Sequence, residues 1–164
     1  MRILLLGSAL SLAFSLFLTP LFIRLFAKIG WGQFIRQDGP KTHFVKRGTP
    51  TMGGIVILLA ILFGYFTSHL IEGVPPSYSA VLVLGLMVGL GFVGFLDDYS
   101  KIRQQQSLGL SPRAKVIGQI LVAVTFAVLA VSFPDSDGQT PASPGISLVR
   151  GADIVSFAQW GQTA

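Results

Sequence analysis

The apolar residues of this chain are gathered into four long windows that contain no Asp, Glu, Lys or Arg. The windows are Ile3–Ile23, Gly48–Ile71, Gly73–Leu96 and Val116–Pro134. Each is close to the roughly 20 residues that a helix needs to cross the hydrocarbon core of a bilayer. None alternates polar and apolar positions as the strands of a membrane barrel do. The pattern therefore predicts an all-α polytopic membrane protein with transmembrane helices at about 3–23, 52–71, 77–96 and 114–133.

The composition describes two environments rather than one. The chain is 51% hydrophobic and only 12% charged, whereas a soluble domain carries about 25% charged residues. All 12 basic and all 7 acidic residues lie outside the four windows. These figures exclude a soluble globular domain and a disordered chain, and the lack of Cys excludes a disulfide framework. A signal peptide is an alternative for the first window, but the window is longer than usual and has no clear small-x-small cleavage site.

The basic residues predict how the chain sits in the membrane. All Lys and Arg except Arg2 and Arg150 fall in the loops 24–51 and 97–115. The positive-inside rule places these loops in the cytoplasm and the N-terminus outside. We expect residues 1–134 to form the transmembrane part and residues 135–164 to form an extracytoplasmic tail with a short β-hairpin. The basic face either only sets topology and contacts anionic lipid or also attracts an anionic substrate.

Three helix ends should meet at the cytoplasmic face, namely the N-termini of the second and fourth helices and the C-terminus of the third. Helix N-termini present unpaired N–H groups that favour phosphate. Within Gly48–Gly54, Thr49 can cap the second helix and Pro50 suits its first position. Ser111 and Pro112 have the same relation to the fourth helix.

Glycines in the windows predict close helix packing. Gly85 and Gly89 in the third window form a small-x3-small pattern, which lets membrane helices approach closely. Gly64 in the second window is a weaker candidate for such a contact. We assign these positions packing and no chemistry.

The acidic pair Asp97 and Asp98 is expected at the end of the third helix. Adjacent carboxylates repel each other, the C-terminal end of a helix favours cations, and ionisable groups beside hydrocarbon are costly and commonly functional. Two explanations remain open. Lys101 is three or four residues away and can form a local ion pair. Alternatively, the carboxylates bind a divalent cation, and hard oxygen ligands beside a phosphate site select Mg²⁺; the position of the pair favours this metal or catalytic role.

Two motifs resemble those of a known family. His43-x2-Lys46-x-Gly48-Thr49-Pro50-Thr51-Met52-Gly53-Gly54 resembles the first cytoplasmic loop of the phospho-N-acetylmuramoyl-pentapeptide-transferases, the lipid I synthases of bacterial cell-wall assembly. Gly94-Phe95-Leu96-Asp97-Asp98-Tyr99-x-Lys101, followed by Gly109-Leu110 and Lys115, resembles the second loop. Each motif lies at the cytoplasmic end of the expected helix, and the resemblance covers about residues 1–134.

The resemblance implies an enzyme of the bacterial inner (plasma) membrane that requires Mg²⁺ and has a cytoplasmic active face. Its partners would be UDP-N-acetylmuramoyl-pentapeptide, undecaprenyl phosphate and membrane lipid, with no nucleic acid and with a homodimer left open. It would release UMP and form lipid I. Asp97 and Asp98 would be catalytic and would also be candidate Mg²⁺ ligands. The implied substrate-binding residues are His43, Lys46, Thr49, Thr51, Lys101 and Lys115.

The length of the chain sets it apart from the family it resembles. Family members are about twice as long, with ten spans and a third catalytic aspartate in the part that has no counterpart here. We therefore expect a fragment or a truncated product whose half-built site is inactive alone. Two other functions stay open: another polyprenyl-phosphate N-acetylhexosamine-1-phosphate transferase, and a small non-enzymatic membrane protein.

Overall fold

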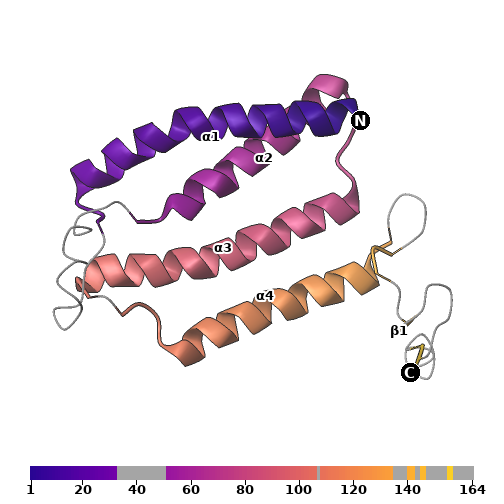
Figure 1. The fold of residues 1–164 in the computed structure, drawn as a ribbon. Helices are drawn as coiled ribbons and strands as arrows, with labels where there is room; N and C mark the ends of the chain where they lie inside the picture. Colours follow the sequence, from indigo (N-terminus) through magenta and orange to yellow (C-terminus); the bar gives the residue numbers. More distant parts are fainter. Residues whose placement is uncertain (33–50, 107, 135–139, 143–144, 147–154, 157–164) are drawn as a thin grey trace.

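Four helices and one short pair of strands make up the part of the chain that the structure describes (Figure 1). The structure is a computed structural model, and it describes residues 1–32, 51–106, 108–134, 140–142, 145–146 and 155–156. The elements are α1 (Arg2–Ile29), α2 (Gly53–Glu72), α3 (Tyr78–Gln104), α4 (Pro112–Ser132), β1 (Gly145–Ile146) and β2 (Val155–Ser156). All four helices are long and apolar enough to cross a membrane, which confirms the predicted all-α polytopic class.

The helices lie side by side and alternate in direction (Figure 1). α1 packs mainly on α2, α3 packs mainly on α4, and α2 touches α3 more lightly. The N-terminus and the α2–α3 connection lie at one end, and the α3–α4 connection lies at the other. Many large apolar side chains on all four helices are exposed, as a lipid environment requires.

Small residues set the contact between α1 and α2. A Cβ added at Gly64 would meet the Ser11 hydroxyl and would lie 2.8 Å from the Ser11 backbone nitrogen. Across the same contact, a Cβ at Gly7 would lie 3.1 Å from the Ser68 hydroxyl. The two backbones therefore approach each other through residues with little or no side chain, which is how membrane helices gain packing energy.

The glycines of α3 behave differently from the predicted pattern. A Cβ at Gly89 would lie 2.8 Å from Val122 of α4, so this glycine does permit a close contact. A Cβ at Gly85 would meet nothing within 4 Å. The small-x3-small prediction is therefore wrong at Gly85, and Gly64, ranked below both in the sequence, makes the closer approach.

The helix ends explain where the predicted boundaries fail. α2 and α4 agree with prediction to within about two residues, whereas α1 continues to Ile29 and α3 continues to Gln104. The apolar windows stop at the first charge, but Lys, Arg and Gln are good helix formers and carry the helices onward. In both helices the residue after the last one takes a left-handed conformation. This residue is Gly30 after α1, with φ of 79°, and Gln105 after α3, with φ of 51°. The loops predicted at 24–51 and 97–115 thus begin inside helices.

The two predicted helix starts have different outcomes. Ser111 caps α4 by accepting a hydrogen bond from the Ala114 N–H at 3.3 Å, with Pro112 as the first helical residue, as predicted. The assignment of Pro50 to the first helical position of α2 is wrong, because α2 begins at Gly53 after Met52 takes a left-handed conformation with φ of 70°. The cap assigned to Thr49 lies outside the described residues.

The tail contains a short antiparallel strand pair. Gly145 pairs with Ser156 and Ile146 pairs with Val155, which agrees with the predicted hairpin contact. The extracytoplasmic side of this hairpin and the outside location of the N-terminus stay predictions.

Candidate active site

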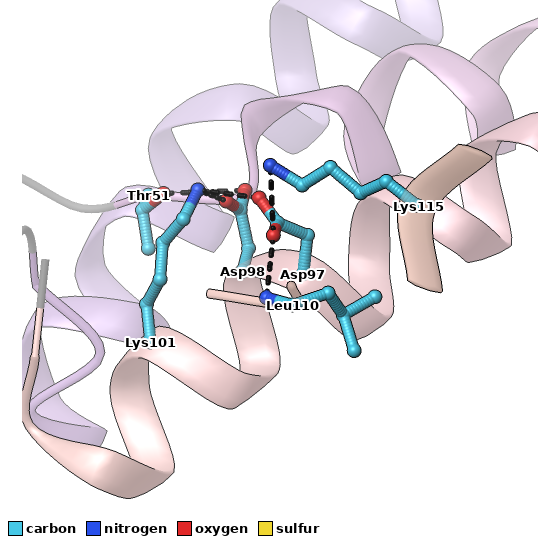
Figure 2. A network of polar contacts seen from close by, with 6 residues as sticks. All are labelled: Thr51, Asp97, Asp98, Lys101, Leu110 and Lys115. Carbon is cyan, nitrogen blue, oxygen red and sulfur yellow. Dashed lines mark hydrogen bonds and ion pairs between the residues drawn. The ribbon is translucent and has the colours of Figure 1, made fainter. Parts of the chain in front are cut away.

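Asp97 and Asp98 lie in the last two turns of α3, and they contact Thr51 just before α2 and Leu110 just before α4 (Figure 2). α3 continues past them to Gln104, so their expected position at the negative end of the helix is wrong. The last turn of α3 instead carries Lys101 and Arg103, whose charges suit a helix C-terminus. The acidic pair therefore belongs to the helix surface facing the other elements, and its environment comes from tertiary contacts.

The Asp97 side chain is nearly buried and contacts three donors. Only 7% of the residue is exposed. Lys101 Nζ lies 2.7 Å from its Oδ2 and Lys115 Nζ lies 3.0 Å from its Oδ1. The backbone N–H of Leu110 also donates to Oδ1, with an N–O distance of 2.8 Å. A buried carboxylate is costly unless it is paired and hydrogen-bonded, and these three donors supply both conditions.

Asp98 has fewer contacts and is more exposed. Its side chain is 29% exposed, compared with 10% for the Asp97 side chain. Lys101 Nζ lies 2.8 Å from its Oδ1. The hydroxyl of Thr51 donates to its Oδ2 at 3.4 Å, which is long for a hydrogen bond between oxygens. Counting contacts from the described part of the chain, Asp98 Oδ2 is therefore the most weakly held oxygen of the pair.

Lys101 connects the two carboxylates from one turn further along α3. The predicted local ion pair is present and includes both acidic residues. Lys115 joins this group from the first turn of α4 and contacts Asp97 but, within the described residues, not Asp98. Two carboxylates thus face two ammonium groups, as Figure 2 shows. The two ammonium groups could bind an anion by exchanging their contacts with the carboxylates for contacts with the oxygens of the anion.

The described part of the chain contains five of the eight predicted site residues, and all five are in this cluster. They are Thr51, Asp97, Asp98, Lys101 and Lys115. The other three, His43, Lys46 and Thr49, lie outside the described residues.

A groove of about 460 Å³ lies between α2 and α3, and Asp97 and Asp98 form part of its lining. The rest of its lining is mainly apolar. It includes Met52, Ile55, Leu58, Met87, Gly91 and Phe95. Two acidic residues and a set of apolar side chains thus line one space, an arrangement suited to a molecule with an apolar chain and a polar head.

Two parts of the site have no counterpart in the sequence analysis. The first is the Leu110 N–H, which belonged to a quoted motif without a structural role. The second is an aromatic contact between Trp31 and Tyr99, with ring centroids 6.2 Å apart in an edge-to-face arrangement. Trp31 also contacts Phe26, so these rings connect the end of α1 to α3 beside the acidic pair. Sequence spacing gives no signal for either contact, because both depend on how the helices are placed.

The donor atoms fit a magnesium ion in part. Within the described residues, no group of three His, Cys, Asp or Glu side chains comes together. Mg²⁺ needs only one or two carboxylates when water and substrate phosphates complete its shell. The weakly held Asp98 Oδ2 suits such a contact, whereas both oxygens of Asp97 already accept from nitrogen donors.

The fold and the site together define a multi-pass helical membrane protein with a polar carboxylate–lysine cluster at one end of its helices. Comparison with known proteins shows which proteins of this class the chain resembles. A signature described as Phospho-N-acetylmuramoyl-pentapeptide-transferase signature 1 matches residues 46–58, which include Thr51. No solved structure matches the chain significantly.

Several curated relatives carry the name Phospho-N-acetylmuramoyl-pentapeptide-transferase. One from Clavibacter michiganensis is 60% identical over 153 residues, which are 90% of this chain and 42% of the relative. One from Kineococcus radiotolerans is 54% identical over 99% of this chain and 46% of its own length. One from Cutibacterium acnes is 50% identical over 98% of this chain and 45% of its own length.

These matches confirm the resemblance seen in the two motifs. Over nearly all of its own length, the chain is similar to proteins named phospho-N-acetylmuramoyl-pentapeptide-transferase. It spans less than half the length of the curated relatives it matches.

Proposed function

We propose that this chain forms part of a phospho-N-acetylmuramoyl-pentapeptide-transferase of the bacterial inner membrane with a cytoplasmic active face. In the proposed reaction, a phosphate oxygen of undecaprenyl phosphate attacks the β-phosphorus of UDP-N-acetylmuramoyl-pentapeptide. The bond from that phosphorus to the bridging oxygen breaks, UMP leaves with the electron pair, and lipid I forms. The names of the relatives support the substrates, and the carboxylate–lysine cluster beside an apolar groove supports a site for phosphate on a lipid.

The contacts suggest a division of labour within the cluster. Lys101 and Lys115 are the candidates to bind phosphate oxygens, because each is a flexible cation already at the site. Their transfer to the substrate would release Asp97, which is then the candidate to position or deprotonate the attacking phosphate. Thr51, together with Lys46 from outside the described residues, is the candidate for binding the nucleotide part.

Asp98 is the residue best suited to hold Mg²⁺, because among the described residues its Oδ2 has only a long contact to Thr51. When bound, the ion would supply positive charge against the pyrophosphate as its bond breaks. Because the chain spans less than half of its relatives, we expect further ligands and a third carboxylate to come from the remaining part. A homodimer also stays a prediction, which the mass of the protein in detergent tests.

The proposal can be tested with a chimera that supplies the remaining part. The segment of the Clavibacter michiganensis relative that aligns with this chain is replaced by this chain. The chimera is then incubated with both substrates and Mg²⁺, and lipid I and UMP are measured. We expect activity from the chimera, none from the chimera with Asp97→Asn, and none from the chain alone. A folded chimera that is inactive beside an active parent enzyme contradicts the proposal.

The two other functions predict different outcomes. A transferase for another sugar would form product from UDP-N-acetylglucosamine in membranes holding the intact protein, and the pentapeptide substrate would give none. A non-enzymatic membrane protein would leave cell-wall synthesis unchanged when the intact protein carries Asp97→Asn.

A further inference from the structure

The turn before α4 approaches Asp97 more closely than any side chain would allow. Gly109 precedes Leu110, whose N–H donates to Asp97 Oδ1 at 2.8 Å. A Cβ built at Gly109 would meet Asp97 Oδ1 itself. It would also lie 2.6 Å from the Asp97 carbonyl oxygen and 2.7 Å from its carboxyl carbon. Real carbon–oxygen contacts are longer than this, so any side chain at Gly109 forces the turn and α3 apart.

The need for glycine here is steric and not conformational. Among the described glycines, only Gly30 and Gly73 have a positive φ, so the backbone of Gly109 is open to other residues. A flexible side-chain tip could move aside at little cost, but the Asp97 carbonyl oxygen belongs to the backbone of α3. The lack of a Cβ at Gly109 therefore allows this turn to lie in close contact with Asp97.

The same approach fixes the direction of the carboxylate. Lys101 and Lys115 are both partly exposed and flexible, so neither holds Asp97 in one rotamer. The Leu110 N–H is a backbone donor at the start of a capped helix, since Ser111 caps α4 directly after it. It is the rigid partner of the three. When the lysine side chains leave Asp97 to contact an anion, the Leu110 N–H stays in place and keeps the carboxylate in the same orientation.

We propose that Gly109 is a positioning residue: by lacking a side chain, it lets the Leu110 N–H hold the Asp97 carboxylate in the orientation that the site uses. The effect of Gly109 on catalysis rests on the proposed transferase function, whereas its effect on the hydrogen bond between Leu110 and Asp97 does not. A displacement of about 1 Å in a reacting group can cost about 100-fold in rate. The Gly109→Ala variant should therefore lose turnover while the groups that bind substrate remain.

The test measures the hydrogen bond first, in the full chain held in detergent micelles. The exchange rate and proton shift of the Leu110 amide are recorded by NMR for the native chain, Gly109→Ala and Gly85→Ala. Gly85 is the matched control, because its added Cβ meets nothing within 4 Å. We expect at least tenfold faster Leu110 exchange and an upfield shift in Gly109→Ala, with no change in Gly85→Ala. An unchanged Leu110 amide in folded Gly109→Ala overturns the proposal.

A second variant covers the case in which Gly109→Ala does not fold. Asp97→Asn keeps Gly109 but weakens the acceptor, so the Leu110 amide should again shift upfield and exchange faster. If the exchange rate and proton shift of the Leu110 amide are the same in Asp97→Asn as in the native chain, the hydrogen bond is not formed and the proposal is overturned.

Turnover is then measured in the chimera described above. Gly109→Ala should lower kcat by about 10- to 100-fold with KM for the nucleotide substrate within about threefold, whereas Gly85→Ala changes neither. A lost amide signature with normal kcat overturns the positioning role. If the unmodified chimera is inactive, the transferase proposal fails, and the amide measurement alone still decides whether Gly109 orients Asp97.

Discussion

Replacing Asp97 by Asn should destabilise the chain much more than replacing Asp98 by Asn, although the two residues are adjacent. Asp97 loses its charge toward Lys101, Lys115 and the Leu110 N–H. Ion pairs with partly exposed lysines are worth about 0.5–1 kcal/mol each. Turning a charge-assisted hydrogen bond into a neutral one costs about 1 kcal/mol more. The free energy of unfolding should therefore fall by about 2–3 kcal/mol in Asp97→Asn.

Asp98 has less to lose from the same change. Among the described residues, its ion pair is with Lys101, which keeps its contact to Asp97, and its contact to Thr51 is long. The expected cost of Asp98→Asn is about 1 kcal/mol or less. The difference between the two variants should therefore be at least about 1 kcal/mol, or about fivefold in the unfolding equilibrium constant, if burial and donor number set the cost.

The measurement is equilibrium unfolding by SDS in mixed micelles, followed by helical circular dichroism and by Trp31 fluorescence. The chain has two Trp residues, so Trp160→Phe in every variant leaves Trp31 as the single reporter. Trp31 packs against Phe26 and Tyr99 and should lose that environment on unfolding. Equal costs for the two substitutions, or a larger cost for Asp98→Asn, would refute the reasoning.

Three further predictions concern the helices and their orientation. Gly64→Ala should lower the unfolding free energy by about 1–3 kcal/mol through overpacking against α1, while Gly54→Ala, with open space, should cost nothing in the same SDS titration. Ser111→Ala should remove the α4 cap and cost about 0.5–2 kcal/mol, and an unchanged unfolding midpoint would argue against the cap. Because the chain has no Cys, single cysteines report topology cleanly. A membrane-impermeant maleimide should label Val74→Cys in intact cells and label Gln106→Cys only after permeabilisation, and the reverse pattern would contradict the predicted orientation.

The sequence was sufficient for the membrane class, because long charge-free windows have few other physical explanations. It also offered the pairing of Lys101 with Asp97 and Asp98 as one of two explanations, since residues three and four apart share one face of a helix, and both ion pairs are present. The cap at Ser111 followed from local chemistry in the same way. Each of these features depends on neighbours along the chain, and such features can be predicted from a pattern.

Tertiary structure decided what the pattern could not. The end of α3 is a different case, because helix propensity, which is also local, extends it to Gln104 past the apolar window that the charge pattern predicts as its limit. The difference between Asp97 and Asp98 arises because only one of two adjacent side chains faces Lys115 and the Leu110 N–H. The choice of Gly64 over Gly85 as a close contact likewise depended on where α1 and α4 lie. Sequence sets which groups are present on a helix face, but the placement of a second helix determines which of them are buried, paired or crowded.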